Sequence, residues 1–330
     1  MKDIIKLNTN ENPYPPSPAA VRALLECSAE QMRLYPDPAA SVLTEAIAET
    51  YGVNTDQVFV GVGSDDVLAM CFMTFFNSED PILFPDITYS FYDVWADLFR
   101  IPYERVLLDE DFCIRPEDYR RPNGGIIFPN PNAPTGVAMS LACVEDIIKN
   151  NPHVIVIVDE AYVDFGAETA QKLLDRYENL VVVQTFSKSR SMAGMRIGFA
   201  LASPELIGYL NDVKYSFNSY TMNAAALAAG AAAVRDTVYL KETVGQIIET
   251  REWTKEALRD LGFSFPDSKS NFIFATHETC PAKELFEKLK EAGIFVRYFD
   301  KPRISNYLRI TIGTRPQMER LVDVLQQLIK

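Results

Sequence analysis

The chain is organised around the stretch Thr185-Phe186-Ser187-Lys188-Ser189-Arg190-Ser191-Met192-Ala193-Gly194-Met195-Arg196. The apolar runs 180–183 and 197–202 flank it and predict two buried strands. A lysine at the end of a buried strand can lose its charge and act as a nucleophile. Neighbouring hydroxyls and an arginine would suit a phosphate group. Because an isolated loop lysine is more often a solvated charge, the role of Lys188 depends on what the rest of the chain places around it.

Length and charge bound the class of protein. The 330 residues can form two domains, and the 48% hydrophobic and 23% charged shares are typical of a soluble globular chain. The net charge of −13 argues against a nucleic-acid surface, which would need a basic face. A small anionic substrate remains compatible with it, because a few arginines in a pocket can outweigh a global negative field.

Cysteine and histidine usage indicates neither a disulfide framework nor a zinc site. The five cysteines are scattered singly, without a Cys-x-x-Cys pair, and there are only two histidines, His153 and His277. The N-terminus lacks a signal-peptide pattern, and no run reaches the ~18 apolar residues of a membrane span. We therefore expect a cytoplasmic protein without a metal site and without a membrane partner.

Short apolar runs alternate with helical patterns through the first two thirds of the chain. Strands are predicted at 57–60, 81–84, 103–108, 125–128, 154–158, 180–184 and 196–202. Between them, helices are predicted at 67–76, 89–99 and 141–150. Apolar strands separated by helices predict an α/β fold with a mostly parallel sheet covered by helices on both faces.

The two ends of the chain read differently. Residues 7–18 contain four prolines and three asparagines, which predict an extended arm followed by a helix at 18–30. A long helix at 237–261 leads into short alternating strands and helices, which predict a small α+β domain with an antiparallel element. We expect an N-terminal arm and helix at 1–30 that packs with the small domain, a large domain at 31–240, and the small domain at 241–330.

Polar segments follow the carboxyl ends of several predicted strands. They are the glycine turn at 61–66, the Asn/Pro loop at 129–136, Asp159 and Lys188. In doubly wound sheets ligands bind beyond these ends, and a helix that starts at a glycine turn can bind an anion. The turn alone fits an ordinary capped helix equally well, but the convergence of four such segments favours a site.

Asp159 ends a buried apolar run, where a carboxylate is costly without a cationic partner. An ion pair with Lys188 is one interpretation, and a protonated heterocycle is the other. A lysine for a Schiff base, a phosphate site at Ser187 and Arg196, and a carboxylate for a pyridinium nitrogen match pyridoxal 5′-phosphate. Tyr162, three residues after Asp159, is placed to hydrogen-bond the phenolic oxygen of such a ring.

The sequence resembles a known family over essentially the whole chain. The segments that carry the resemblance are Asn8-Thr9-Asn10-Glu11-Asn12-Pro13-Tyr14, Tyr35-Pro36-Asp37-Pro38, Asp159-Glu160-Ala161-Tyr162, Ser187-Lys188 through Arg196, Arg297-Tyr298-Phe299-Asp300-Lys301-Pro302 and Asn306-Tyr307-Leu308-Arg309-Ile310-Thr311. They are similar to the fold type I, aspartate-aminotransferase-like enzymes that use pyridoxal 5′-phosphate. The arm and the arginine strands are most similar to the histidinol-phosphate aminotransferases among them.

The resemblance implies a role for each matching residue at the cofactor. Lys188 would hold the cofactor and move a proton, Asp159 would pair with the pyridinium, and Tyr162 would donate to the phenolic oxygen. Tyr89 falls where the family stacks an aromatic on the ring, although helix packing also explains it. The implied phosphate ligands are Ser64, Asp65, Thr185, Ser187 and Arg196.

The resemblance also implies substrate contacts and a homodimer. Arg309 would clamp the substrate α-carboxylate in a bidentate pair, and Arg297 would bind the phosphate of histidinol phosphate together with Tyr14. Without the resemblance both arginines could be exposed strand charges. Tyr35 would reach the cofactor phosphate of the partner subunit, which requires a second copy of the chain.

One position departs from the family pattern. Many relatives read Asn-Pro-Thr-Gly, and this asparagine binds the phenolic oxygen of the cofactor, but Ala133 stands there in this chain. We predict that Asn132 takes the contact through a shifted loop, with Asn130 as the alternative. If neither asparagine reaches, Tyr162 alone would hold that oxygen.

The activity implied by the resemblance is transamination between histidinol phosphate or imidazole acetol phosphate and glutamate or 2-oxoglutarate, in histidine biosynthesis. Two alternatives keep the fold and cofactor: a threonine-phosphate decarboxylase and an aromatic amino acid aminotransferase. A third is a binding protein with an inactive site. Retention of Lys188, Asp159 and Arg196 together argues against the third.

Overall fold

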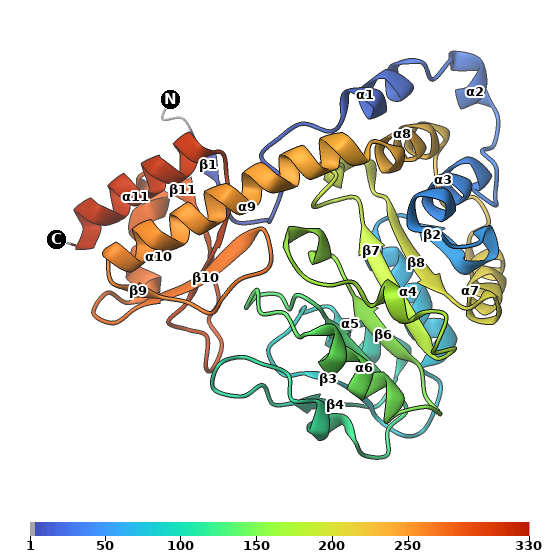
Figure 1. The fold of residues 1–330 in the computed structure, drawn as a ribbon, viewed down its shortest axis with the longest axis horizontal. Coiled ribbons are helices and arrows are strands. Elements are labelled where there is room, and N and C mark those ends of the chain that lie inside the picture. Colours follow the sequence, from blue (N-terminus) through green and yellow to red (C-terminus); the bar gives the residue numbers. More distant parts are fainter. Residues whose placement is uncertain (1–3, 330) are drawn as a thin grey trace.

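In the computed structural model, which describes residues 4–329, a seven-stranded sheet forms the larger part of the molecule (Figure 1). Its order is β2-β8-β7-β6-β5-β3-β4, and only β8 runs antiparallel to its neighbours. The predicted mostly parallel α/β sheet is thus confirmed. The strands are β2 (Val58–Gly61), β3 (Ile82–Pro85), β4 (Tyr103–Val106), β5 (Gly125–Pro129), β6 (Val156–Asp159), β7 (Leu180–Thr185) and β8 (Gly198–Ala202).

Helices cover both faces of this sheet, as its uninterrupted apolar strands require. Alternate strand residues point to opposite faces: Ile126 and Phe128 pack in one core, and Ile127 in the other. The first face is covered by α3 (Ser41–Tyr51), α6 (Leu141–Lys149) and α8 (Ala224–Arg235), and the second by α4 (Ser64–Phe75), α5 (Tyr92–Phe99) and α7 (Pro204–Phe217). Within residues 4–329, the helices lack the length and apolar character needed to cross a bilayer.

A four-stranded antiparallel sheet of order β12-β13-β10-β9 forms the smaller part, which confirms the predicted α+β element. The long helix α9 (Thr237–Asp260) runs from α8 to this sheet (Figure 1). The strands are β9 (Phe263–Ser264), β10 (Phe272–His277), β12 (Arg297–Tyr298) and β13 (Leu308–Thr311). With α9, the helices α10 (Ala282–Glu291) and α11 (Arg315–Ile329) enclose a separate apolar core.

The N-terminal segment contacts both parts of the molecule. Strand β1 (Ile5–Lys6) pairs in parallel with β11 (Ile294–Phe295) of the smaller part, whereas α1 (Pro18–Leu25) packs against α8 of the larger part. Where one helix was predicted at 18–30, the chain forms α1 and then α2 (Ala29–Arg33). Ser28 restarts the helix because it forms a capping box with Gln31. The domain boundaries at 30/31 and 240/241 stay a prediction, and residues 1–3 lie outside the described chain.

Candidate active site

Three neighbouring parallel strands deliver the central residues to one edge of the large sheet. Asp159 is the last residue of β6, Thr185 is the last residue of β7, and the loop that starts at Asn130 follows β5. Because β5, β6 and β7 are parallel and adjacent, their carboxyl ends lie side by side. The topology therefore brings together Asn130 and Thr185, which are 55 positions apart in the sequence (185 − 130).

Asp159 is buried, with 5% of its surface exposed, and two hydrogen bonds hold its carboxylate. The Tyr92 hydroxyl donates to Oδ2 at 2.8 Å, and the Ala161 amide donates to Oδ1 at 3.2 Å. Burial raises the pKa of Asp159 to about 6, although both hydrogen bonds favour the ionised form. An N–H cation bound beside this carboxylate would restore its charge. Tyr92 was not predicted as a site residue; its only sequence signal is its place three residues after Tyr89.

The N-terminal arm holds the segment that carries Lys188. The Lys188 Nζ donates to the Thr9 carbonyl at 3.3 Å and lies 5.8 Å from the centre of the Tyr162 ring. The Asn12 side-chain Nδ2 donates to the backbone carbonyls of Lys188 and Ser189 at 3.0 and 3.1 Å. The predicted lysine and tyrosine therefore lie together, with the arm across them.

Asn10 joins this arm to Tyr162 and to the smaller sheet. Its Nδ2 donates to the Tyr162 hydroxyl at 2.9 Å, and its Oδ1 accepts from the Thr311 hydroxyl at 3.0 Å. The Asn271 side-chain Nδ2 donates to the backbone carbonyl of Asn10 at 3.0 Å. Asn10 has φ of 56°, a left-handed conformation that asparagine tolerates better than most residues. Sequence reasoning treated the arm as a substrate contact and did not single out this residue.

The predicted phosphate ligands gather where helix α4 begins. Ser64 is the first residue of α4, and Gly63 before it has no side chain with which to cap the helix. Gly63 has φ of 85°, and a Cβ there would lie 2.4 Å from the Arg196 Nη2. The Arg196 Nη1 donates to the Ser187 Oγ at 3.4 Å, and the Ser187 amide donates to the Thr185 Oγ1 at 3.1 Å. A helix start, two hydroxyls and a guanidinium are thus grouped in a way that suits an anion, and their role as phosphate ligands stays a prediction.

Asp65 and Tyr89 lie at the side of this anion site. The Tyr89 hydroxyl donates to the Asp65 Oδ1 at 2.8 Å, and burial together with the Asp65 charge raises the Tyr89 pKa. The Asp65 Oδ2 lies 3.8 Å from the Arg196 Nη2. Because this carboxylate would repel a phosphate, Asp65 is suited to contribute its amide N–H rather than its side chain. Tyr89 precedes α5, which begins at Tyr92 and not at 89 as the pattern predicted.

The side chains of the two asparagines of the Asn/Pro loop are hydrogen-bonded to this loop and to neighbouring segments. The Asn132 side-chain Nδ2 donates to the Ile87 carbonyl at 2.9 Å and to the Thr135 hydroxyl at 3.1 Å. The Asn130 Oδ1 accepts from the Met139 amide at 2.8 Å. Ala133 is buried in the same apolar cluster as Tyr162. A contact between Asn132 and a cofactor oxygen therefore stays a prediction.

The two predicted substrate arginines face each other on neighbouring strands. Arg297 of β12 and Arg309 of β13 are register partners, and each guanidinium lies 5.6 Å from the centre of the Phe299 ring. The Arg309 Nη2 donates to the Asn8 carbonyl at 3.1 Å, while its buried Nε has no hydrogen-bond partner among residues 4–329. Burial lowers the pKa of Arg309, and the Arg297 charge lowers it further. Like charges directly opposite are unfavourable unless an anion lies between them.

The two remaining predicted residues lie further out. Tyr14 is half-buried against the core of the smaller part, where burial first and then Glu249 raise the pKa of its hydroxyl. Tyr35 follows α2, is 83% exposed, and lies 4.8 Å from the ring of Tyr220. Its predicted contact with a partner subunit stays a prediction.

Comparison with known proteins gives the family. A family profile described as "Aminotransferase class I and II" matches residues 2–325. The histidinol-phosphate aminotransferase of Brachyspira hyodysenteriae is 52% identical over 330 residues, which span 100% of this chain and 93% of that protein.

Two solved structures share the fold. The crystal structure of histidinol-phosphate aminotransferase from Clostridium acetobutylicum has a TM-score of 0.91 at 20% identity and covers 99% of both chains. That from Sinorhizobium meliloti, in complex with pyridoxal-5′-phosphate, has a TM-score of 0.86 at 22% identity, with 98% of this chain and 91% of that chain covered. At these identities the two structures show the fold alone. The profile and the 52% identity over the full length show that this chain belongs to the class I and II aminotransferase family, and within it to the histidinol-phosphate aminotransferases.

Proposed function

We propose that the chain is a homodimeric cytoplasmic transaminase that uses pyridoxal 5′-phosphate to exchange an amino group between histidinol phosphate and 2-oxoglutarate in histidine biosynthesis. The observation that carries the proposal is the pair Arg297 and Arg309, two arginines in register on neighbouring strands. This pair would attract an anionic substrate to the edge at which Lys188 and Asp159 lie. The names of the curated relatives agree with it.

The residues present fit the cofactor that the family uses. When bound, pyridoxal 5′-phosphate supplies a ring that withdraws electrons from the substrate Cα–H bond. Asp159, whose pKa is raised by burial despite the Lys188 charge, would hold the proton at the ring nitrogen. Arg196 and the amides at the start of α4 would bind the phosphate. Tyr162, oriented by Asn10, would donate to the phenolic oxygen.

Lys188 is placed to attach the cofactor and to carry the proton of the reaction. Its Nζ sits between the Thr9 carbonyl of the arm and the face of Tyr162. The arm accepts a hydrogen bond from this nitrogen, and the Asn12 side chain of the arm fixes the carbonyls of Lys188 and Ser189. A fixed amine next to a reacting carbon is what general acid–base transfer requires.

The arginine pair fits two anions in turn. Histidinol phosphate carries a phosphate ester where an amino acid carries its α-carboxylate, so both substrates would present an anion to Arg309. A carboxylate would pair with Arg309 in bidentate fashion. The second charge of a phosphate ester would be balanced by Arg297, which is exposed. Tyr14 would add a hydroxyl from the arm.

Exposed apolar side chains support the homodimer. They are concentrated on α1, α2, the segment after α2 and the end of α7: Leu25, Met32, Leu34, Tyr35 and Phe217. Exposed clusters of this kind mark interaction surfaces. Because Tyr35 lies among them, association of two copies through this face would bring it to the partner.

Absorbance and substrate comparison test the proposal. Purified protein with pyridoxal 5′-phosphate should show a visible band that shifts on adding glutamate, and Lys188→Ala should lose the covalently held cofactor while the exposed control Lys172→Ala keeps it. Turnover of histidinol phosphate should exceed that of phenylalanine at least tenfold. Release of carbon dioxide from threonine phosphate without 2-oxoglutarate, or comparable turnover of phenylalanine, would contradict the proposed substrate. A colourless protein would contradict the cofactor.

A further inference from the structure

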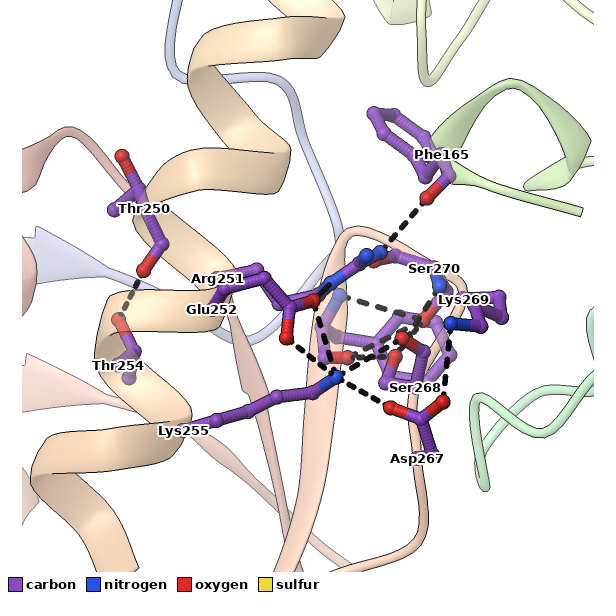
Figure 2. Close-up of polar contacts among 11 residues, drawn as sticks. Phe165, Thr250, Arg251, Glu252, Thr254, Lys255, Asp267, Ser268, Lys269 and Ser270 are labelled. Atoms are coloured by element: carbon purple, nitrogen blue, oxygen red, sulfur yellow. Dashed lines mark hydrogen bonds and ion pairs between the residues drawn. The ribbon is translucent and has the colours of Figure 1, made fainter.

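Helix α9 carries two buried cations beside the turn that leads into β10 (Figure 2). The side chains of Arg251 and Lys255 are 3% and 1% exposed. Cations are almost never fully buried unless they are paired. Lys255 satisfies this rule locally: its Nζ lies 2.7 Å from the Asp267 Oδ1 and 3.1 Å from the Glu252 Oε2, and it donates to the Ser268 carbonyl at 3.4 Å.

Arg251 instead contacts both parts of the molecule. Its Nη1 donates to the Phe165 carbonyl and to the Ser270 carbonyl, each at 2.8 Å, and its Nε donates to Glu252. Phe165 ends a short 3-10 helix, Val163–Phe165, that begins directly after Tyr162. Ser270 lies two residues before Phe272, the first residue of β10. Figure 2 shows the guanidinium between these two carbonyls.

The segments tied by Arg251 lead to the two ends of the active site. The Tyr162 ring packs edge-on against Phe272, with ring centres 5.1 Å apart. The Arg309 guanidinium lies 5.4 Å from the centre of the same Phe272 ring. Phe272 is therefore the spacer between the tyrosine of the cofactor end and the arginine of the substrate end. Arg251 fixes the chain three residues after Tyr162 and two residues before Phe272.

The surrounding contacts are close-packed, so a shift at Arg251 has few places to be absorbed. The Lys269 amide donates to the Gly136 carbonyl at 2.8 Å, and a Cβ on Gly136 would lie 2.6 Å from the Ser268 Oγ. Gly136 has φ of 79°, so the loop after β5 meets the turn before β10 through a position suited to glycine. Tightly packed contacts transmit displacement instead of damping it.

We propose that Arg251 is a positioning residue that sets the spacing between Tyr162 and Arg309 by tying the large-sheet segment after Tyr162 to the start of β10. The inference rests on the proposed transaminase function and adds to it a residue that touches neither substrate nor cofactor. Arginine suits this place because its planar guanidinium holds two carbonyls while its Nε binds Glu252. The shorter, flexible lysine keeps the charge and cannot hold all three acceptors in one plane.

Comparison of Arg251→Lys with Lys255→Met tests the inference. Lys255 is the matched control, because it lies one turn further along α9 in the same ion cluster and its polar partners within residues 4–329 are Glu252, Asp267 and Ser268. Both variants should lower the melting temperature. Only Arg251→Lys should lower kcat/KM for glutamate and for histidinol phosphate, by a similar factor of roughly 10 to 100, because both substrates use Arg309. It should also shift the pH midpoint of the visible band of the bound cofactor.

Hydrogen exchange of the cofactor-free protein separates this inference from the proposed function. Amides at 162–166 should exchange faster in Arg251→Lys than in the wild type, with no such change in Lys255→Met. A wild type that fails to turn over histidinol phosphate contradicts the proposed function. In that case the exchange comparison by itself tests whether Arg251 holds the segment after Tyr162 in place. The inference is overturned if Arg251→Lys matches Lys255→Met in exchange at 162–166, or in kcat/KM and the pH midpoint of an active enzyme.

Discussion

The two ends of the site carry unbalanced charge of opposite sign and are built in different ways. The proposed cofactor end rests on strand ends of one sheet, where burial outweighs the Lys188 charge and raises the pKa of Asp159. The substrate end is assembled from the arm and the small sheet, where Arg309 faces Arg297. Asn10 and Thr311, which join at this end, are 301 positions apart in the chain. The comparison shows that a sheet topology can fix one half of a site by itself, whereas the other half depends on contacts between distant segments.

The largest expected effect is at the cofactor end. Asp159→Asn keeps the shape and can still accept from Tyr92, but it cannot supply the negative charge that keeps a ring nitrogen protonated. We expect kcat to fall by roughly 10²- to 10³-fold, the range for removing one preorganised electrostatic group. Steady-state kinetics at saturating cofactor measure the loss. Tyr92→Phe, which removes one hydrogen bond and keeps the charge, should lose less. Wild-type kcat in Asp159→Asn would show that the carboxylate has another role.

The same carboxylate should make the cofactor-free protein less stable as pH rises. Its pKa in the folded state, about 6, lies above the ordinary value of 3.8, so the folded state binds the proton more tightly than the unfolded state. The stability is therefore fully present below about pH 4 and is lost as pH rises to about 6, by at most ~3 kcal/mol.

Denaturant unfolding of wild type and Asp159→Asn at a series of pH values isolates this contribution. The wild type should lose free energy of unfolding relative to the variant between pH 4 and 6, because asparagine stays neutral. Glu160, whose pKa burial raises to about 7, is present in both proteins and cancels. A constant difference between the two proteins across this range would mean that Asp159 is already balanced in the cofactor-free fold.

At the substrate end, Arg309→Lys tests the clamp. Loss of a charge-assisted bidentate pair costs roughly 1.5–3 kcal/mol, so kcat/KM should fall about ten- to hundredfold for glutamate and for histidinol phosphate alike. Arg297→Gln is the comparison. It should lower kcat/KM for histidinol phosphate more than for glutamate, because the phosphate ester carries both of its charges on the group that Arg309 binds, whereas the second charge of glutamate lies on its distant γ-carboxylate. An equal loss of kcat/KM for both substrates in Arg297→Gln would mean that Arg297 attracts anions in general and does not recognise the phosphate.

The contrast between the two ends of the site also explains which of their residues can be predicted from the sequence. Apolar runs predict the strands, and the polar residues at their ends predict Asp159 and Lys188, because in a parallel sheet the strand order brings carboxyl ends together; Thr185 was implied by the family resemblance alone. Tyr92 and Asn10 were missed. Tyr92 lies on a helix where an aromatic is explained by packing, and the partners of Asn10 come from the other end of the chain. The break between α1 and α2 depends on one capping box. This local signal is hidden in the sequence, because the helical pattern continues across it.

The smallest effect, and the one that sharpens the comparison most, is at Asn10, where the two ends meet. Asn10→Gly keeps the left-handed backbone and removes the hydrogen bonds to Tyr162 and Thr311. We expect about 1 kcal/mol lower stability and a few-fold lower kcat, since the Tyr162 hydroxyl loses its partner. Asn10→Ala should lose slightly more stability, because its Cβ strains a positive φ. Glu11→Ala, on the exposed side of the arm, is the control. If Asn10→Gly lowers kcat no more than Glu11→Ala does, the arm lies across the site without positioning it, and the two ends are joined through Phe272 and Arg251.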